Sequence, residues 1–324
     1  MSTSPRHRYV VIGAGAIGGT LAAHMVQAGH DVLLCDAAAD HVEAVNRDGL
    51  RIEGPVAQLH VRVPAVLPAD LPDRIDRAVI AVKAHHTRAA VEPLVERLAP
   101  DGVVLTVQNG LTADVLVELL GEERVVSSFV NIGADYLEPG RILQGNVAAF
   151  RVGELHGGEI TPRVRELVEV LPYAQATDNV LGYLWGKEAY GAMLWAGAVS
   201  DLTIAESLER PEYRPLMVAL AREVLSQSPV PVESFDGFEP DDLEGSLDRL
   251  AAFNRRSAKQ YSGIYRDLVV RRRKTEIDSQ LEDLRGPIFA RIGAIVHDIE
   301  DGRREVSTAN LDELASYAAS LPTP

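Results

Sequence analysis

A short apolar run that leads straight into a glycine-rich turn constrains the fold of this chain more than any other feature. Residues 9–12 (YVVI) precede residues 13–18 (GAGAIG), and a helical apolar pattern follows them. In such a unit Gly13 permits a tight turn, Gly15 lets a pyrophosphate approach the backbone, and Gly18 lets helix and strand pack closely. The start of the helix also offers N–H groups and a positive dipole end to phosphates. The residues predicted to bind a dinucleotide here are Gly13, Gly15, Ala16, Ile17 and Gly18.

A lone acidic residue, Asp36, follows the second predicted strand, residues 31–35. This is the position at which a carboxylate accepts hydrogen bonds from the adenosine ribose hydroxyls. A 2′-phosphate would bring roughly two negative charges against it, and no Arg or Lys stands in residues 37–40. We therefore expect NAD(H) to be preferred over NADP(H). Asp36 could instead cap the next helix, and the two roles are compatible.

The first half of the chain alternates short apolar runs with helical patterns, which is typical of a doubly wound parallel sheet. The apolar run at residues 78–82 is expected of a strand buried on both faces. Other strands are predicted at residues 103–107 and 125–130, hairpin-like segments at 50–53 and 60–63, and edge strands at 147–152 and 174–177. Helices are predicted at residues 39–48, 87–98, 113–120 and 162–171, the last with Thr161 as N-cap and Pro162 in its first turn.

Beyond residue 178 the strand-like runs end and long helical patterns take over. Helices are predicted at residues 181–202, 214–227, 243–254, 280–301 and 311–320, with residues 228–239 as a loop between two of them. We therefore predict an α/β fold with a Rossmann-type doubly wound parallel sheet at residues 1–177. An all-helical domain at residues 178–324 is expected to bind substrate and to form a homodimer.

Composition limits the partners of the chain. Its 324 residues can hold two domains, and its formal net charge of −15 argues against nucleic acid and anionic membrane surfaces. A small acidic substrate must therefore meet a local positive cluster. The single cysteine, Cys35, excludes an intrachain disulfide, is expected to be buried and suits a cytoplasmic protein. No signal peptide or apolar stretch of roughly 20 residues is evident, so no membrane span is predicted.

Two polar residues end predicted parallel strands, at the edge where such sheets bind ligands. Lys83 follows the strand at 78–82 and can neutralise a phosphate or hold the nicotinamide ribose. Asn109 follows the strand at 103–107 and can contact the ribose or the substrate through its amide. An exposed lysine and a plain Asn-Gly turn are the alternative interpretations. The adjacent pair His85-His86 lacks metal-ligand spacing, and no metal site is predicted.

Lys187 stands inside the predicted helix 181–202, which is otherwise apolar on most sides. A charge on such a helix is costly unless it faces a wet cleft or a partner, although the side chain could also extend its ammonium into water. A basic block follows at residues 266–274, within which Arg266 and Arg271 are the candidates to bind a carboxylate. Glu276 is either a first-turn acid of the next helix or a functional carboxylate opposite Lys187.

Together, these motifs resemble the ketopantoate reductase (2-dehydropantoate 2-reductase) family, whose C-terminal domain is of the 6-phosphogluconate-dehydrogenase type. The resemblance runs from about residue 9 to residue 319, and its two family-specific motifs are residues 184–187 (LWGK) and 275–278 (TEID). It implies that Lys187 is the catalytic lysine and Glu276 its partner carboxylate. The less specific motifs are residues 13–18, 82–84, 108–110, 133–134 and 139–140. The resemblance also implies that Lys83 and Asn109 lie at positions that contact the cofactor and the substrate.

The chain departs from the family pattern where the substrate would bind. The resemblance implies asparagines four and eight residues after the lysine, but Gly191 and Trp195 stand there. Of the expected serine pair only Ser262 is present, and Ala37 replaces the arginine that would hold a 2′-phosphate. Each lost hydrogen bond to a buried polar substrate costs about 1–3 kcal/mol.

Ketopantoate is therefore a poor fit, and a different 2-oxo or 2-hydroxy acid is expected. Such an acid could be held by Ser262 together with Arg266 or Arg271 through a bidentate contact. The expected reaction is hydride transfer between a nicotinamide and this acid, with Lys187 as general acid or base. The alternatives are an NAD-dependent dehydrogenase of another hydroxy or sugar acid, and a dinucleotide sensor without catalysis.

Overall fold

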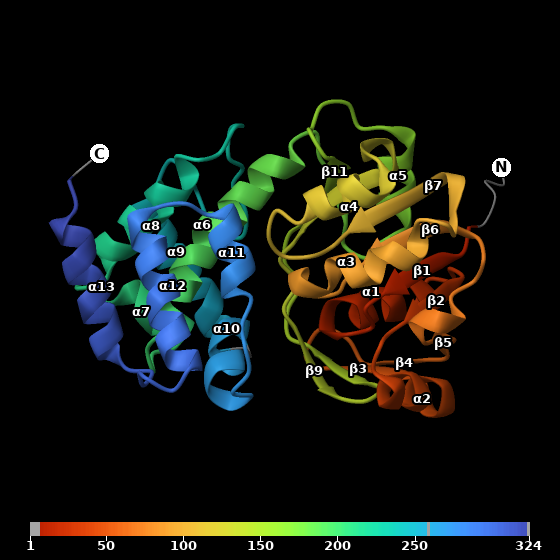
Figure 1. Cartoon of the computed structure of the whole chain (residues 1–324), viewed down its shortest axis with the longest axis horizontal. Helices are drawn as coiled ribbons and strands as arrows, with labels where there is room; N and C mark the ends of the chain where they lie inside the picture. The colour runs from red at the N-terminus through yellow and green to blue at the C-terminus, as the bar shows by residue number, and fades with distance from the viewer. Residues whose placement is uncertain (1–6, 258–259, 323–324) are drawn as a thin grey trace. The chain divides into compact units, whose positions relative to one another are not determined.

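The computed structural model describes residues 7–257 and 260–322. The chain divides into two compact units, one ending at Val180 and the other beginning at Leu181 (Figure 1). The N-terminal unit contains the strands and the C-terminal unit is built from helices, which confirms the predicted fold class.

An eight-stranded sheet with the order β12-β11-β8-β7-β6-β1-β2-β5 forms the centre of the N-terminal unit. Its strands are parallel except where β11 runs antiparallel to β8. The strands are β1 (Tyr9–Ile12), β2 (Val32–Cys35), β5 (Ala65–Val66), β6 (Ile75–Ile80), β7 (Leu98–Thr106), β8 (Val125–Val130), β11 (Phe150–Glu154) and β12 (Gln175–Ala176). Cys35 is buried at the end of β2, and burial raises the pKa of its thiol to about 12.

Helices cover both faces of this sheet. Successive side chains of β1 therefore pack in two different apolar cores, one on each face. Tyr9 and Val11 pack in one core, and Val10 and Ile12 pack in the other. The helices are α1 (Ala16–Gln27), α2 (Ala39–Asp48), α3 (Thr87–Val91), α4 (Ala113–Leu120) and α5 (Pro162–Val170). The predicted cap of α5 is present, since the Thr161 hydroxyl accepts a hydrogen bond from the Val164 N–H.

A second, four-stranded sheet with the order β4-β3-β10-β9 was not predicted. Its strands are β3 (Leu50–Glu53), β4 (Leu59–Val61), β9 (Ala134–Glu138) and β10 (Arg141–Gln144). The antiparallel pair of β3 and β4 confirms the predicted hairpin-like segments. The parallel pairing of β3 with β10 joins segments far apart in the chain, and no local pattern indicates it.

Three predicted elements were wrong in their extent or place. The predicted helix 87–98 ends at Val91 and passes into a 3₁₀ turn that contains Pro93, and β7 begins at Leu98. The predicted helix 280–301 is two helices, interrupted at Gly286, whose φ of +151° is followed by Pro287. The predicted edge strand 147–152 became β11, which lies between β8 and β12 inside the sheet.

The C-terminal unit contains α6 (Val180–Ala198), α7 (Ile204–Glu209), α8 (Arg214–Leu225), α9 (Leu243–Arg256), α10 (Gly263–Tyr265), α11 (Ile277–Asp283), α12 (Pro287–Glu300) and α13 (Thr308–Ser320). A π-helical turn, Arg266–Val270, continues α10. The start of α12 is held by the Glu223 carboxylate, which accepts hydrogen bonds from the N–H groups of Ile288 and Phe289. Among the described residues, none of the helices combines the length and apolar character that crossing a membrane requires.

A buried ionic network ties α5 to the central sheet. The Arg77 guanidinium, 8% exposed on β6, donates two hydrogen bonds of 2.8 Å to the Glu166 carboxylate, and the Tyr9 hydroxyl donates another of 2.9 Å. Burial by itself raises the pKa of Glu166, but these hydrogen bonds outweigh it and leave the pKa below its ordinary value.

We expect Glu166→Gln to lower the free energy of unfolding by about 1–3 kcal/mol at neutral pH, because the buried Arg77 loses its charged partner. The lowered pKa means that this stabilisation is present at neutral pH and is lost as the pH falls through the folded-state value. The difference between the variant and the parent should therefore shrink on acidification in urea titrations. Asp31→Asn is the matched control, because Arg8 and Asp31 form an exposed pair worth about 0.5 kcal/mol or less.

Candidate active site

The glycine-rich turn has the close approaches that its sequence predicts. Gly13 has a φ of +94°, and a Cβ there would lie 2.8 Å from the Ala81 carbonyl carbon. A Cβ on Gly18 would lie 2.0 Å from the Gly13 oxygen, so α1 can pack against the sheet only through a glycine. Apart from its two chain neighbours, no described residue has a heavy atom within 4 Å of a Cβ built on Gly15.

The Asp36 carboxylate lies against this turn and contacts the backbone on both sides. Its Oδ2 accepts a 2.8 Å hydrogen bond from the Ala14 N–H, and its Oδ1 accepts a 2.9 Å hydrogen bond from the Ala38 N–H, just before α2. Asp36 does not cap α2, because the N-cap residue is Ala38 and no side chain of the described residues accepts a capping hydrogen bond there. Each carboxylate oxygen can accept a second hydrogen bond, so contact with a ribose hydroxyl stays open to it.

These residues fit a dinucleotide. α1 begins directly after Gly15, carries no acidic residue in its first turn, and leaves its first backbone N–H groups without intrahelical acceptors. The open space beside Gly15 lets an anion reach those groups. A pyrophosphate held there would have Asp36 at the end of the neighbouring strand.

Lys83 and Asn109 follow β6 and β7, two parallel strands that pair side by side with Ile80 opposite Thr106. Lys83 is half-buried and Asn109 is exposed. The residue between β7 and Asn109 has a role that sequence reasoning missed. The Gln108 amide nitrogen donates to the Val82 carbonyl oxygen at 2.9 Å and to the Thr87 hydroxyl at 2.7 Å. Gln108 thereby fixes the chain on both sides of Lys83.

Lys187 lies on α6, a helix that is buried on nearly all sides. Between residues 182 and 200 only four positions are partly exposed, namely Tyr183, Lys187, Gly191 and Leu194. Their spacing of four, four and three residues places them along one face of the helix. The lysine therefore stands on a narrow accessible stripe of an otherwise buried helix.

The electrostatic surroundings of Lys187 favour proton transfer near neutral pH. Burial lowers the pKa of its ammonium to about 8, and the neighbouring Glu188 carboxylate acts in the opposite direction. Glu188 itself is 4% exposed. A lysine with such a pKa can hold a proton at neutral pH and can also release it, as a general acid or base requires.

The predicted loop 228–239 packs directly on this part of α6. The Glu233 N–H donates a 3.3 Å hydrogen bond to the Gly182 carbonyl oxygen. A Cβ on Gly186 would lie 3.1 Å from the Glu233 carbonyl oxygen and from the Phe235 ring, so a larger residue before Lys187 would press against the loop. Sequence reasoning identified the loop but not its place beside the lysine.

Glu276 is the residue immediately before α11, on the same unit as Lys187. The preceding residue is anchored, because the Thr275 N–H and hydroxyl both donate to the Glu300 carboxylate at 2.7 Å. Lys274 pairs with the same carboxylate at 3.3 Å. Glu300, which sequence reasoning did not single out, thus positions the segment that carries Glu276.

Ser262 and Arg271, which are predicted to bind substrate, make hydrogen bonds within the protein. The Ser262 hydroxyl accepts a 3.1 Å hydrogen bond from the Tyr265 N–H at the start of α10. The Arg271 guanidinium donates a 2.9 Å hydrogen bond to Asp267, a carboxylate that is 4% exposed and also paired with Arg273. Arg271 therefore neutralises a buried acid, and Arg266 begins the π-helical turn that contains this acid.

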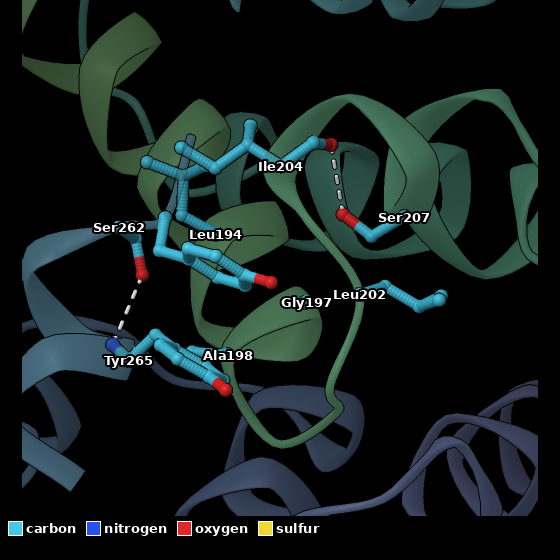
Figure 2. Close-up of a pocket in the computed structure, with 9 residues that line it drawn as sticks. Leu194, Gly197, Ala198, Leu202, Ile204, Ser207, Ser262 and Tyr265 are labelled. Atoms are coloured by element: carbon cyan, nitrogen blue, oxygen red, sulfur yellow. Dashed lines mark hydrogen bonds between the residues drawn. The ribbon is translucent and has the colours of Figure 1, made fainter. Parts of the chain in front are cut away.

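Ser262 also lines a small pocket in the C-terminal unit, beside Leu194 of the accessible stripe (Figure 2). The pocket has a volume of about 10 Å³, which is room for roughly one water molecule. Its other lining residues are Gly197, Ala198, Leu202, Ile204, Ser207, Tyr261 and Tyr265. It is too small to hold an organic acid in this form.

Gly191 and Trp195 are the two departures from the family pattern on α6. Gly191 lies one turn from Lys187 on the same stripe. Apart from its chain neighbours and the backbone of its own helix, no described residue has a heavy atom within 4 Å of a Cβ built on it. Trp195 is 4% exposed and belongs to the apolar interior. Neither position supplies a polar side chain beside the lysine. Across residues 7–257 and 260–322, no three histidine, cysteine or acidic side chains are arranged to hold a metal ion.

The sheet, the glycine-rich turn and the strand-end Asp36 define a dinucleotide-binding protein of the Rossmann class. A family model described as ketopantoate reductase PanE/ApbA matches residues 9–157. A 2-dehydropantoate 2-reductase of Streptococcus pyogenes serotype M3 is 24% identical over 83% of this chain and 87% of its own length. This chain is therefore similar to the ketopantoate reductases, and the match to the family model lies within its N-terminal unit.

Two further comparisons extend this similarity. A 2-dehydropantoate 2-reductase of Mesorhizobium japonicum is 27% identical over 56% of this chain, and the match spans only 63% of the relative's length. The structure of a D-mandelate dehydrogenase with NADH and anilino(oxo)acetate superposes with a TM-score of 0.79 over 91% of this chain and 99% of the other, at 21% identity. At that identity the likeness shows the shared fold.

Proposed function

We propose that this protein is an NAD(H)-dependent oxidoreductase that interconverts a small 2-oxo acid and the corresponding 2-hydroxy acid, with Lys187 as general acid or base. The observation that carries the proposal is the position of Lys187 on the one accessible stripe of α6, with its pKa lowered to about 8. The similarity to ketopantoate reductases supports the reaction class, and the nicotinamide supplies or accepts the hydride.

The residues of the chain then have separate roles. As hydride reaches the carbonyl carbon, negative charge grows on the carbonyl oxygen, where the Lys187 ammonium stabilises it and donates its proton. Glu276 orients Lys187 or accepts a hydrogen bond from a substrate hydroxyl. Arg266 or Arg271, with Ser262, holds the substrate carboxylate. In the oxidative direction the neutral amine accepts the proton from the hydroxyl group.

The cofactor is assigned to the N-terminal unit. The backbone at Gly15, Ala16 and Ile17 donates to the pyrophosphate, Asp36 accepts from the adenosine ribose, and Lys83 and Asn109 contact the nicotinamide half. The absence of a polar side chain at Gly191 argues for a substrate other than ketopantoate. The anilino(oxo)acetate that accompanies NADH in the D-mandelate dehydrogenase structure carries a carbonyl group next to a carboxylate, as a 2-oxo acid does.

The proposal is tested by steady-state oxidation of NADH with a panel of 2-oxo acids that differ in the side chain: pyruvate, ketopantoate, 4-methyl-2-oxopentanoate, phenylpyruvate and phenylglyoxylate. Turnover with at least one of them, and with the matching 2-hydroxy acid and NAD in reverse, supports an enzyme of this class. Tight NADH binding without turnover of any of these acids or of the hydroxy acids would overturn it and favour a dinucleotide sensor.

We expect kcat/KM to be at least about tenfold higher with NADH than with NADPH, a difference of about 1.4 kcal/mol. The reason is that a 2′-phosphate would lie against the Asp36 carboxylate with no basic residue at positions 37–40. Ala37→Arg should raise kcat/KM for NADPH and leave that for NADH within a few fold, with Ala37→Gln as the uncharged control. Equal use of the two cofactors by the parent protein would contradict the role given to Asp36.

A further inference from the structure

His41 connects the glycine-rich turn to the second sheet. It lies in the first turn of α2, is 1% exposed, and both nitrogens of its ring have backbone partners. Its Nε2 lies 3.0 Å from the Ala14 carbonyl oxygen, and its Nδ1 lies 3.0 Å from the Gly140 nitrogen. The Tyr136 ring packs edge-on against it with a centroid distance of 5.2 Å.

The two contacts define the protonation of the ring. A backbone N–H can only donate, so Nδ1 must accept from Gly140 with its lone pair. A carbonyl oxygen can only accept, so Nε2 must carry the hydrogen that it donates to Ala14. The site therefore requires neutral imidazole with the hydrogen on Nε2, because a second hydrogen on Nδ1 would face the Gly140 N–H.

The hydrogen bond from His41 to the Ala14 carbonyl oxygen determines the direction of the Gly15 N–H, which faces a ligand of the turn. The carbonyl of Ala14 and the N–H of Gly15 belong to one planar trans peptide and point in opposite directions. Holding the carbonyl oxygen toward His41 therefore directs the Gly15 N–H away from it. The peptide on the other side of Ala14 is held by Asp36, which accepts the Ala14 N–H at 2.8 Å. Asp36 thus fixes the peptide group before Ala14, and His41 fixes the peptide group after it.

The far side of His41 is held by the second sheet. Gly140 stands in the turn between β9 and β10, with a φ of +78°. Its carbonyl oxygen accepts a 2.9 Å hydrogen bond from the Arg51 N–H of β3. The turn is thereby fixed to its own sheet, and the position of Nδ1 follows from that of Gly140.

We propose that His41 is a positioning residue for cofactor binding, which presents the Gly15 N–H to the pyrophosphate by holding the Ala14 carbonyl. The inference rests on one part of the proposed function, namely that NAD(H) binds at the glycine-rich turn. Each contact of His41 can be removed separately. Asparagine keeps an acceptor near the position of Nδ1, and glutamine places an amide N–H near the position of Nε2.

The test compares His41→Asn and His41→Gln by calorimetric titration with NADH and by steady-state kinetics. We expect His41→Asn to raise the Kd and KM for NADH by about 3–10-fold, the effect of one lost hydrogen bond, with kcat at saturating NADH unchanged. His41→Gln should restore binding to within about twofold. The ¹⁵N shifts of the parent ring should show Nε2 protonated and Nδ1 unprotonated, with NADH bound or absent.

Both variants lose one hydrogen bond, so a role in stability alone would lower their melting temperatures alike and leave NADH affinity unchanged in the folded protein. That result, or equal weakening of NADH binding in both variants, would overturn the inference. Failure of the parent protein to bind NADH at all would instead contradict the proposed function.

Discussion

Replacing Lys187 with methionine should lower kcat by about 10²–10⁴-fold in both directions of the reaction, the usual contribution of a general acid or base. Methionine is apolar and similar in length, so it suits the largely buried helix α6 and removes only the ammonium. The affinity for NADH should change by less than about threefold, because the glycine-rich turn and Asp36 belong to the N-terminal unit. Steady-state kinetics and calorimetric titration measure the two effects separately.

The pH dependence gives an independent check on Lys187. Because burial lowers its pKa to about 8, 2-oxo acid reduction should fall as the pH rises through that region, where the proton donor is lost. Oxidation of the hydroxy acid should rise over the same range, because it needs the neutral amine. The carboxylate of Glu188 holds the pKa up, so Glu188→Gln should shift both profiles to lower pH.

Lys187→Arg separates charge from proton transfer. Arginine keeps the positive charge but does not release a proton at accessible pH. The Lys187→Arg variant should retain part of the rate of 2-oxo acid reduction, and its rate should no longer change with pH near 8. A methionine variant with full turnover, or profiles that do not respond to Glu188→Gln, would remove Lys187 from the proposed chemistry.

The elements that the sequence predicted well are those with a strong local pattern. The opening strand, the glycine turn and α1 follow from apolar periodicity and from the spacing of Gly13, Gly15 and Gly18. The helix 39–48 was predicted with its observed bounds, as was the strand 125–130. The four-stranded sheet was missed because the pairing of β3 with β10 depends on contacts between distant segments.

The candidate site was predictable only for residues whose chemistry is unusual in their surroundings. Lys187 stood out because a charge on an apolar helix requires an explanation, and Asp36 because it follows a buried strand. The contacts of His41, Gln108 and Glu300 were not predicted, although residues 108–110 form one of the motifs named above. Their roles come from backbone groups that the fold brings to them, and a linear pattern does not contain that information.

The two glycines of the turn, Gly15 and Gly18, should respond in opposite ways to an added side chain. Gly15→Val should leave the melting temperature close to that of the parent, because the space beside Gly15 is open among the described residues and its φ of −68° suits any residue. The valine would fill the space through which the pyrophosphate approaches α1. We expect the Kd for NADH to rise by about 10–100-fold, the range that overpacking by 1–3 kcal/mol gives.

Gly18→Ala is the matched comparison, since even one methyl group there would lie 2.0 Å from the Gly13 oxygen and 2.8 Å from the Ala81 Cβ. α1 must move away from the sheet to accept it, so the free energy of unfolding should fall by about 1–3 kcal/mol or more. Thermal melts and NADH titrations of both variants distinguish the two effects. If Gly15→Val bound NADH as the parent does, the pyrophosphate would not pass this glycine, and the assignment of the cofactor to the turn would be wrong.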